Sequence, residues 1–370
     1  MYLKPKINSY SSQHGGNLIE EARRLGVNAK SIIDASASVV PFSPPIALRN
    51  HLKKAVDNYN LRHYPDIKHK KLKEAISNWH QIETEMILPG NGASELFTWA
   101  AKDASILGLN ALPAPCFSDY ERALNCWDAN YIYQPLPLAW SDKRPQDFPL
   151  TPKAKVLWIT NPHNPTGQLW SKHSIESLLN EYELVICDEA FLPLVPNGEQ
   201  QSVINLVEKN QNLIVIRSLT KLFSIPGLRL GYAIGSPDRL RKWSEIRGPW
   251  PLNGIAISAG EKIMTDTESL QKWIYKIQHW ITKEGEWLYI KLKETPSIKP
   301  LPSSVNFLLI EGTFPLGELR MKIAERLILL RDCRSFRGLN ENYLRISLQT
   351  RKGNKKLIYS LNEIMKLIPQ

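Results

Sequence analysis

The sequence predicts an α/β fold built on a mainly parallel sheet, in a chain of 370 residues that has room for two cores. Short runs rich in β-branched residues alternate with amphipathic helical stretches, a pattern typical of strand–helix–strand units. The clearest strands are expected at 156–160, 184–187, 213–217 and 230–234. Each is followed by a turn with polar or glycine residues. Ligands of open α/β sheets bind at the carboxyl ends of strands, so we expect the functional residues in these turns.

The pattern changes after Pro251, which predicts a second, smaller α+β domain. The first 40 residues show no strand pattern, and we expect them to pack against this smaller domain. The expected organisation is an N-terminal segment (1–40), a large ligand-binding domain (41–252) and a small C-terminal domain (253–370). The elements expected in the small domain are a long helical stretch (253–292), a strand (305–310), a helix (317–330), a strand (343–348) and a closing helix (355–367).

Composition places the chain among ordinary globular proteins, with 43% hydrophobic and 22% charged residues. No apolar stretch approaches the roughly 18 residues of a membrane-spanning helix, and no signal peptide is visible, so a cytoplasmic protein is expected. The net charge of +11 is spread along the chain, so it predicts solvated helix faces and no nucleic-acid partner. The spacing of the four cysteines is not typical of a zinc site, and no metal is expected.

A glycine turn, Pro89-Gly90-Asn91-Gly92-Ala93-Ser94-Glu95, opens an expected helix. Backbone N–H groups at a helix N-terminus attract anions, and glycine lets a phosphate approach the backbone closely. Gly92, Ala93 and Ser94 are therefore candidate phosphate ligands. Glycine turns of this kind also precede many helices that bind nothing.

Two further motifs follow the ends of expected strands. The loop Asn161-Pro162-His163-Asn164-Pro165-Thr166-Gly167 is rigid and presents Asn164 at the sheet edge, although a plain connection would look similar. Asp188 emerges from an apolar strand, and a buried carboxylate needs a positive partner. A protonated pyridine nitrogen of a ligand would be such a partner. The alternative is that Asp188 caps a helix or forms an internal salt bridge.

The fourth motif is Ser218-Leu219-Thr220-Lys221, with Arg229 eight residues after the lysine. Lysine forms a Schiff base with an aldehyde, and arginine can bind a phosphate through two parallel hydrogen bonds. Ser218, Thr220 and Arg229 can converge on the same phosphate. A lone lysine is more often solvated, but this order of residues suits an aldehyde cofactor that carries a phosphate.

In this order the four motifs resemble the fold-type-I pyridoxal-phosphate enzymes of the histidinol-phosphate aminotransferase group, over nearly the whole chain. The resemblance implies that Lys221 holds pyridoxal 5′-phosphate, that Asp188 pairs with its pyridine nitrogen and that Asn164 binds its 3-oxygen. It also implies a homodimer with active sites at the subunit interface. The other implied cofactor ligands are Phe117 on the ring, Tyr64 from the second subunit, and Gly92, Ala93, Ser94, Ser218, Thr220 and Arg229 at the phosphate.

Three features resemble one branch of this group, the L-threonine-O-3-phosphate decarboxylases of cobalamin biosynthesis. They are His14-Gly15-Gly16-Asn17, Phe191 where aminotransferases usually carry tyrosine, and Arg217–Lys221 followed by Ile225-Pro226-Gly227. The implied reaction converts L-threonine O-3-phosphate to (R)-1-amino-2-propanol O-2-phosphate. The alternatives are a histidinol-phosphate or related aminotransferase using 2-oxoglutarate, and a protein that keeps the fold without catalysis.

The resemblance also implies how a small phosphorylated amino acid is bound. Arg345 matches the arginine that holds the substrate carboxylate. The substrate's phosphate needs a cationic pocket of its own, for which we select His14, Arg331 and Arg337 as candidates, although each of them could instead form an ordinary surface salt bridge. One stretch departs from the branch: Ser36-Ala37-Ser38-Val39-Val40-Pro41 replaces a pattern with two asparagines, at Ser38 and Val40.

Overall fold

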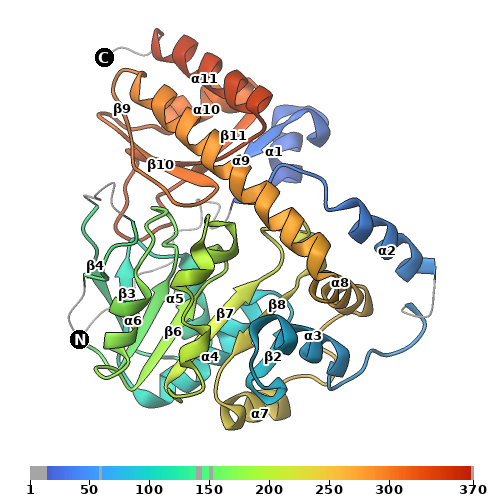
Figure 1. Ribbon diagram of the computed structural model, residues 1–370. Coiled ribbons are helices and arrows are strands. Elements are labelled where there is room, and N and C mark those ends of the chain that lie inside the picture. Colours follow the sequence, from blue (N-terminus) through green and yellow to red (C-terminus); the bar gives the residue numbers. More distant parts are fainter. Residues whose placement is uncertain (1–14, 58–60, 139–143, 150–152, 368–370) are drawn as a thin grey trace.

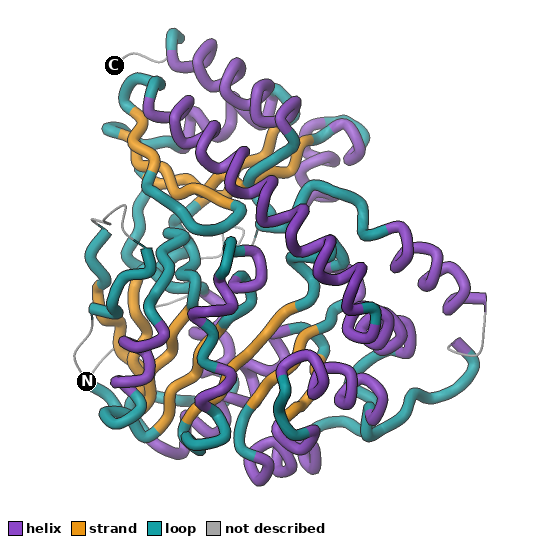
Figure 2. The backbone as a smooth tube through the Cα atoms, in the orientation of Figure 1, coloured by secondary structure: helices purple, strands orange, loops and turns teal. Residues whose placement is uncertain are grey.

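The computed structural model describes residues 15–57, 61–138, 144–149 and 153–367 (Figure 1). Two sheets organise these residues, and the long helix α9 (Thr267–Lys293) runs diagonally from one to the other. Figure 2 shows helices enclosing the strands of the larger sheet. No helix within these described ranges is long and apolar enough to cross a membrane.

The larger sheet has seven strands, and all of them are parallel except β8. This confirms the predicted mainly parallel sheet, and the expected strands at 156–160, 184–187 and 213–217 are each found to within one residue. The fourth expected strand is β8, which runs antiparallel to both of its neighbours. Across the sheet the strands are β2 (Ile87–Gly90), β8 (Gly231–Ile234), β7 (Leu213–Ser218), β6 (Leu184–Asp188), β5 (Val156–Thr160), β3 (Asn110–Ala114) and β4 (Tyr131–Pro135).

Helices cover both faces of this sheet, so the central strands β5, β6 and β7 are buried along their whole length. Alternate residues enter different cores. Trp158 and Ile186 pack with α4 and α5, whereas Ile159 and Val185 pack with α6, α8 and α9. The helices around this sheet are α3 (Lys70–His80), α4 (Ala93–Leu107), α5 (Ser118–Asn125), α6 (Lys172–Leu178), α7 (Pro237–Ile246) and α8 (Gly254–Thr265), with α2 (Ile46–Asp57) beside α8.

The smaller sheet has five strands, in the order β1 (Ile33–Ala35), β11 (Ile328–Asp332), β12 (Tyr343–Ser347), β10 (Phe307–Gly312) and β9 (Ile298–Pro300). Its helices are α1 (Leu18–Leu25), α10 (Gly317–Glu325) and α11 (Arg351–Met365). β1 pairs with β11 in parallel, whereas the other neighbours are antiparallel. The expectation that the first 40 residues contribute no strand is therefore wrong. The domain limits at 41 and 253 remain a prediction.

Two other differences from the expected elements have local causes. The helix expected to reach residue 330 ends at Glu325, and Leu327 takes a left-handed φ of 62°. The apolar run that follows is the strand β11, since a short buried strand and a buried helical turn cannot be distinguished by periodicity. The single helical stretch expected at 253–292 is α8 and α9, which separate at Asp266, whose carboxylate caps α9.

A buried ion pair joins β6 and β7 behind the edge that carries Asp188 and Ser218. The Arg217 side chain is 2% exposed and lies 2.7 Å from the carboxylate of Glu189, which is 0% exposed. Glu189 also accepts hydrogen bonds from the Ser202 hydroxyl and the Val203 amide, and Arg217 donates twice to Glu199. Each buried charge is therefore satisfied, which is the condition under which such charges are tolerated.

We expect Arg217→Ala to lower the free energy of unfolding by about 3–5 kcal/mol, because it leaves Glu189 buried without its cation. Urea unfolding followed by circular dichroism measures the loss. Arg241→Ala is the control, since Arg241 forms ion pairs only at the surface and its removal should leave the unfolding midpoint unchanged. Equal midpoints for Arg217→Ala and the unmodified protein would contradict the expectation.

Candidate active site

The parallel register of β5, β6 and β7 brings the sequence-predicted residues to one edge of the larger sheet. Thr160 pairs with Asp188 at the ends of β5 and β6, and Asp188 pairs with Ile216 on β7. The loop that holds Asn164 begins after β5, and Lys221 lies three residues after β7. These side chains, far apart in the sequence, therefore surround one site.

Asp188 is 5% exposed and is held by two hydrogen bonds. The Tyr120 hydroxyl donates to Oδ2 at 2.6 Å, and the Ala190 amide donates to Oδ1 at 2.9 Å. Burial raises the pKa of Asp188 to about 6, and the hydrogen bond from Tyr120 acts in the opposite direction. A cationic partner such as a protonated ring nitrogen would stabilise the ionised form of this buried carboxyl group.

Tyr120 was not among the sequence-predicted residues. It is fully buried on α5, where its hydroxyl also lies 2.7 Å from the Thr160 hydroxyl. Phe117 begins the same helix and its ring packs edge-on against Tyr120, with centroids 5.8 Å apart. The spacing of three residues from Phe117 was the only available signal, since it places both rings on one helix face.

Lys221 is partly buried, and its Nζ lies 6.0 Å from the ring centroid of Phe191. Burial lowers the pKa of Lys221 to about 8, and the nearby cations Arg345 and Arg229 lower it further. An ordinary lysine has a pKa of 10.5, so this amine is neutral far more often near pH 7. A neutral amine is the form that attacks an aldehyde.

The glycine turn and Arg229 form a cradle at the start of α4. Gly92 has a φ of +77°, and a Cβ added there would lie 2.7 Å from Arg229 Nη2, so only glycine allows the arginine this close. In the sheet, Gly231 of β8 pairs with both Gly90 and Ser218, which places the turn near the Ser218 hydroxyl.

The remaining predicted phosphate ligands fit this cradle in different ways. The Ser218 and Thr220 hydroxyls are buried, 2.8 Å apart. The amides of Ala93 and Ser94 open α4 without a side-chain cap, and such a helix start attracts an anion. The Ser94 hydroxyl accepts a hydrogen bond from Arg122 at 3.2 Å.

The smaller sheet contributes two buried arginines. Arg345 of β12 lies directly opposite Arg331 of β11 in the antiparallel register. The guanidinium of Arg345 donates to Asn164 Oδ1 at 2.5 Å and to the Ser36 carbonyl at 3.2 Å. Burial lowers the pKa of Arg345 to about 9, with a further contribution from Arg331. Asn164 thus connects the loop of the larger sheet to a cation of the smaller sheet.

Aromatic rings support both guanidinium groups. Arg345 lies over Phe307 at 4.8 Å from the centroid, and Arg331 lies over Phe336 at 5.3 Å. Arg331 also donates to the Ser335 hydroxyl at 2.6 Å. Contacts of this kind offset part of the cost of burying a cation.

Two predicted residues lie apart from this group, and a third cannot be placed. Tyr64 is 77% exposed and stacks on Trp250 at 4.2 Å. Arg337 is exposed, and its guanidinium lies over the ring of Tyr133 on β4. His14 lies outside the described residues. The assignment of Tyr64 to the site of a second subunit stays a prediction.

The segment that departs from the decarboxylase pattern lies between the two parts of the site. The buried Ser38 hydroxyl is 3.2 Å from that of Ser347, two residues after Arg345. The Val40 amide donates to the Lys221 carbonyl at 3.4 Å, and the Val40 carbonyl accepts from Ser224. These two positions therefore support the segments that carry Lys221 and Arg345.

The residues present fit pyridoxal phosphate. The buried carboxyl of Asp188 suits the ring nitrogen, and the amine of Lys221 suits the aldehyde. The cradle that a Cβ at Gly92 would fill suits the phosphate.

Comparisons with known proteins agree with this chemistry. The family model for aminotransferase class I and II matches residues 30–361. The threonine-phosphate decarboxylase of Salmonella typhimurium is 30% identical over 96% of this chain and 97% of its own. The histidinol-phosphate aminotransferase of Methanosphaera stadtmanae is 29% identical over 94% of both chains.

A solved structure shows the same fold. It is a histidinol-phosphate aminotransferase from Sinorhizobium meliloti in complex with pyridoxal-5′-phosphate, with a TM-score of 0.80 and 17% identity. The match covers 98% of this chain and 100% of that one. The relatives thus divide between two activities at nearly equal identity.

We expect Tyr120→Phe to raise the pKa of Asp188 above about 6 in the apoprotein, because the hydroxyl donates to the ionised carboxylate. The folded pKa exceeds the ordinary 3.8, so the folded state binds the extra proton and the contribution of Asp188 to stability falls as pH rises from about 4 to 6. In Tyr120→Phe this decline should extend to higher pH.

Urea unfolding at a series of pH values from about 4 to 8 tests this shift. Asp188→Asn is the control, because it removes the titrating group and with it the decline. A decline over the same pH range in Tyr120→Phe and the unmodified protein would refute the role given to the hydroxyl.

Proposed function

The chain belongs to the aminotransferase class I and II family and binds pyridoxal 5′-phosphate, and within this family we propose that it decarboxylates L-threonine O-3-phosphate. The product would be (R)-1-amino-2-propanol O-2-phosphate, with CO₂ released. When bound, the cofactor withdraws electrons from the α-carbon of the amino acid. The rest of the catalysis falls to the residues of this chain.

The observation that carries the proposal is the cross-strand pair Arg331 and Arg345. Both side chains are buried, at 3% and 6% exposure, and they lie opposite each other on β11 and β12. Two buried cations side by side suit a substrate with two anionic groups, since arginine binds carboxylate and phosphate equally well. L-Threonine O-3-phosphate carries both groups on one small molecule.

The assignment of each arginine follows from its neighbours. Arg345 contacts Asn164 and lowers the pKa of Lys221, so it is the arginine nearer the lysine. We assign it to the substrate carboxylate, which is attached to the reacting carbon. Arg331 lies opposite Arg345 on the neighbouring strand β11, and we assign it to the phosphate.

The residues of the larger sheet hold the cofactor in this proposal. Asp188 keeps the pyridine nitrogen protonated, and Asn164 binds the 3-oxygen. Phe117 stacks on the ring, which contributes on the order of 1 kcal/mol beyond its buried area. Ser218, Thr220 and Arg229, with the turn at Gly92, bind the phosphate.

Arg345 decides which bond breaks by orienting the carboxylate out of the plane of the ring. The bond from the α-carbon to the carboxylate then breaks, CO₂ leaves, and the electron pair stays at the α-carbon. Lys221 Nζ delivers a proton to that carbon. Its pKa of about 8 suits this role, because the amine can both gain and lose a proton near neutral pH.

A histidinol-phosphate aminotransferase is the second candidate, favoured by the 29% identical relative. In that reaction Arg345 would bind a carboxylate of 2-oxoglutarate, and Lys221 would move a proton from the α-carbon. The two candidates share the cofactor site and differ in whether a 2-oxo acid is required.

We also propose that the chain acts as a cytoplasmic homodimer. Tyr64 and Leu61 are 77% and 62% exposed, and Trp250 on the same surface is 43% exposed. Large exposed aromatic and aliphatic side chains close together are typical of a protein interface. In the dimer Tyr64 would reach the cofactor phosphate of the second subunit.

We expect the protein loaded with pyridoxal phosphate to release CO₂ from L-threonine O-3-phosphate with no 2-oxo acid present. Lys221→Ala should lose both this release and the visible absorbance of the lysine-bound cofactor. Lys209→Ala, which changes an exposed lysine, is the control and should keep both. Amino transfer from histidinol phosphate to 2-oxoglutarate without CO₂ release would favour the second candidate. Turnover in Lys221→Ala would exclude both.

A second prediction concerns the pH dependence of cofactor uptake. The apoprotein should take up pyridoxal phosphate faster as pH rises through a midpoint near 8, because only the neutral amine of Lys221 reacts. Arg345→Gln should move this midpoint upward. Burial is the largest cause of the lowered pKa of Lys221, and the cation Arg345 is the second. Stopped-flow absorbance measures the rates. A midpoint that is unchanged in Arg345→Gln would be inconsistent with this coupling.

A further inference from the structure

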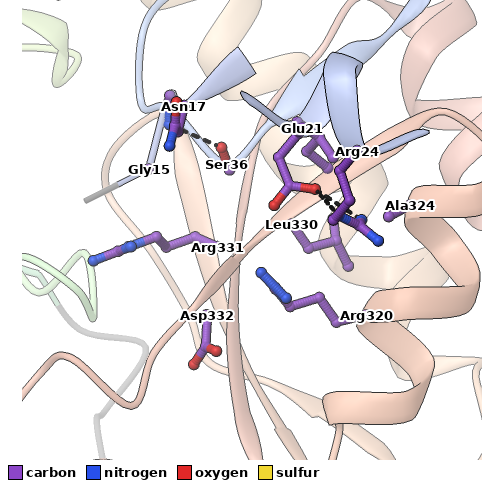
Figure 3. Close-up of a pocket in the computed structure, with 12 residues that line it drawn as sticks. Gly15, Asn17, Glu21, Arg24, Ser36, Arg320, Ala324, Leu330, Arg331 and Asp332 are labelled. Atoms are coloured by element: carbon purple, nitrogen blue, oxygen red, sulfur yellow. Dashed lines mark hydrogen bonds and ion pairs between the residues drawn. The ribbon is translucent and has the colours of Figure 1, made fainter. Parts of the chain in front are cut away.

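A small polar notch lies at the outer edge of the smaller sheet, where the chain leaves β1 and separates from β11 (Figure 3). About 30 Å³ in this notch is accessible to the centre of a water-sized molecule. That space holds about two water molecules, or one small oxyanion in their place. Its charged lining residues are Glu21, Arg24, Arg320, Arg331 and Asp332.

The charged side chains around the notch differ in how they are paired. Arg24 pairs with Glu21 on α1 at 2.7 Å, and Asp332 is bound by Arg334 at 2.6 Å. The side chain of Arg320 on α10 forms no hydrogen bond or ion pair within the described residues, although its charge contributes to the lowered pKa of Asp332. Figure 3 shows its guanidinium pointing into the space between α10 and β11.

The notch adjoins the two arginines assigned to substrate. Arg331 lines it and lies opposite Arg345 on the neighbouring strand. The pKa values of these cations show the same sequence of neighbours. Burial is the largest cause of each lowered pKa, and a neighbouring arginine is a smaller cause. Arg320 contributes to the lowered pKa of Arg331, Arg331 to that of Arg345, and Arg345 to that of Lys221. Cations therefore follow one another from the surface to the reacting lysine.

We propose that this notch is an anion-binding site, centred on Arg320, that captures the phosphate group of the substrate before it reaches Arg331. The inference rests on the proposed function, because it takes the substrate to be a phosphate monoester. A partly buried guanidinium with free donors binds phosphate through parallel hydrogen bonds. The cations further in then favour movement of the anion toward the site.

The lining excludes a metal cation as the preferred occupant. Both carboxylates of the notch already bind arginines, so neither is free to act as a ligand. Arg24 is 51% exposed and can turn toward a second anion, whereas Arg320 is held on α10 beside the buried Leu319 and Ile323. The site is thus formed mainly by one positioned cation. Arg331 also lines the notch, but its guanidinium extends away from Arg320 on the other side of β11 (Figure 3).

The test uses the protein loaded with pyridoxal phosphate and the variant Arg320→Gln. We expect the KM for L-threonine O-3-phosphate to rise roughly three- to tenfold with kcat within about twofold, the effect of losing one charged hydrogen bond. The inhibition constant of inorganic phosphate should rise by a similar factor. Arg320→Lys keeps the charge and should recover part of the loss.

Arg326→Gln is the matched control. Arg326 follows directly after α10, is exposed and does not line the notch, so this substitution removes the same charge at a different place. The proposal is overturned if Arg320→Gln leaves both constants unchanged, or if Arg326→Gln changes them equally. If the unmodified protein releases no CO₂, the proposed function fails on its own. Calorimetric binding of inorganic phosphate to the loaded protein then still tests the notch through the same two variants.

Discussion

The parallel pairing of β5, β6 and β7 is the constraint on which the site depends. These strands are buried on both faces, so their register is set by two cores at once, and a slip of one residue would turn every side chain into the opposite core. The register places the ends of the three strands at one edge. Asp188, Asn164 and Lys221 then meet because each follows a strand end, and the ion pair of Arg217 with Glu189 holds that edge from behind.

Burial controls the charge state of the groups that meet there. Asp188 is held in a state that accepts a cationic partner, while Lys221 loses its proton more readily than an exposed lysine. Both effects arise from the same exclusion of water, and they have opposite signs because one charged form is an anion and the other a cation. Burial thus brings the pKa of the Asp188 carboxyl and the pKa of the Lys221 amine closer together than their ordinary values.

In the proposed function, the smaller sheet supplies the side chains that select the substrate. Its antiparallel pairing sets Arg331 opposite Arg345, and Asn164 joins Arg345 to the loop of the larger sheet. Proteins with this fold carry the names of decarboxylases and aminotransferases at similar identity, so the fold leaves the reaction open. In the proposed function, the placement of the substrate carboxylate against Arg345 separates the two reactions. The segment around Ser38 and Val40 bears on that placement, because it contacts both halves of the site.

The sequence by itself determined the large sheet and the residues at its strand ends. An apolar run such as Val156–Thr160 predicts a buried strand without reference to the rest of the chain. The residues of a motif such as Ser218–Lys221 are neighbours in the sequence, so they are also neighbours in the fold. Only the tertiary structure decided contacts between distant segments. Tyr120 meets Asp188, and Arg345 meets Asn164, through pairings that no local pattern encodes. The strand β11 was missed for the same reason, since its apolar residues become a strand only by pairing with β1 and β12. Local patterns report burial and turn chemistry, whereas partners across the fold are chosen by packing.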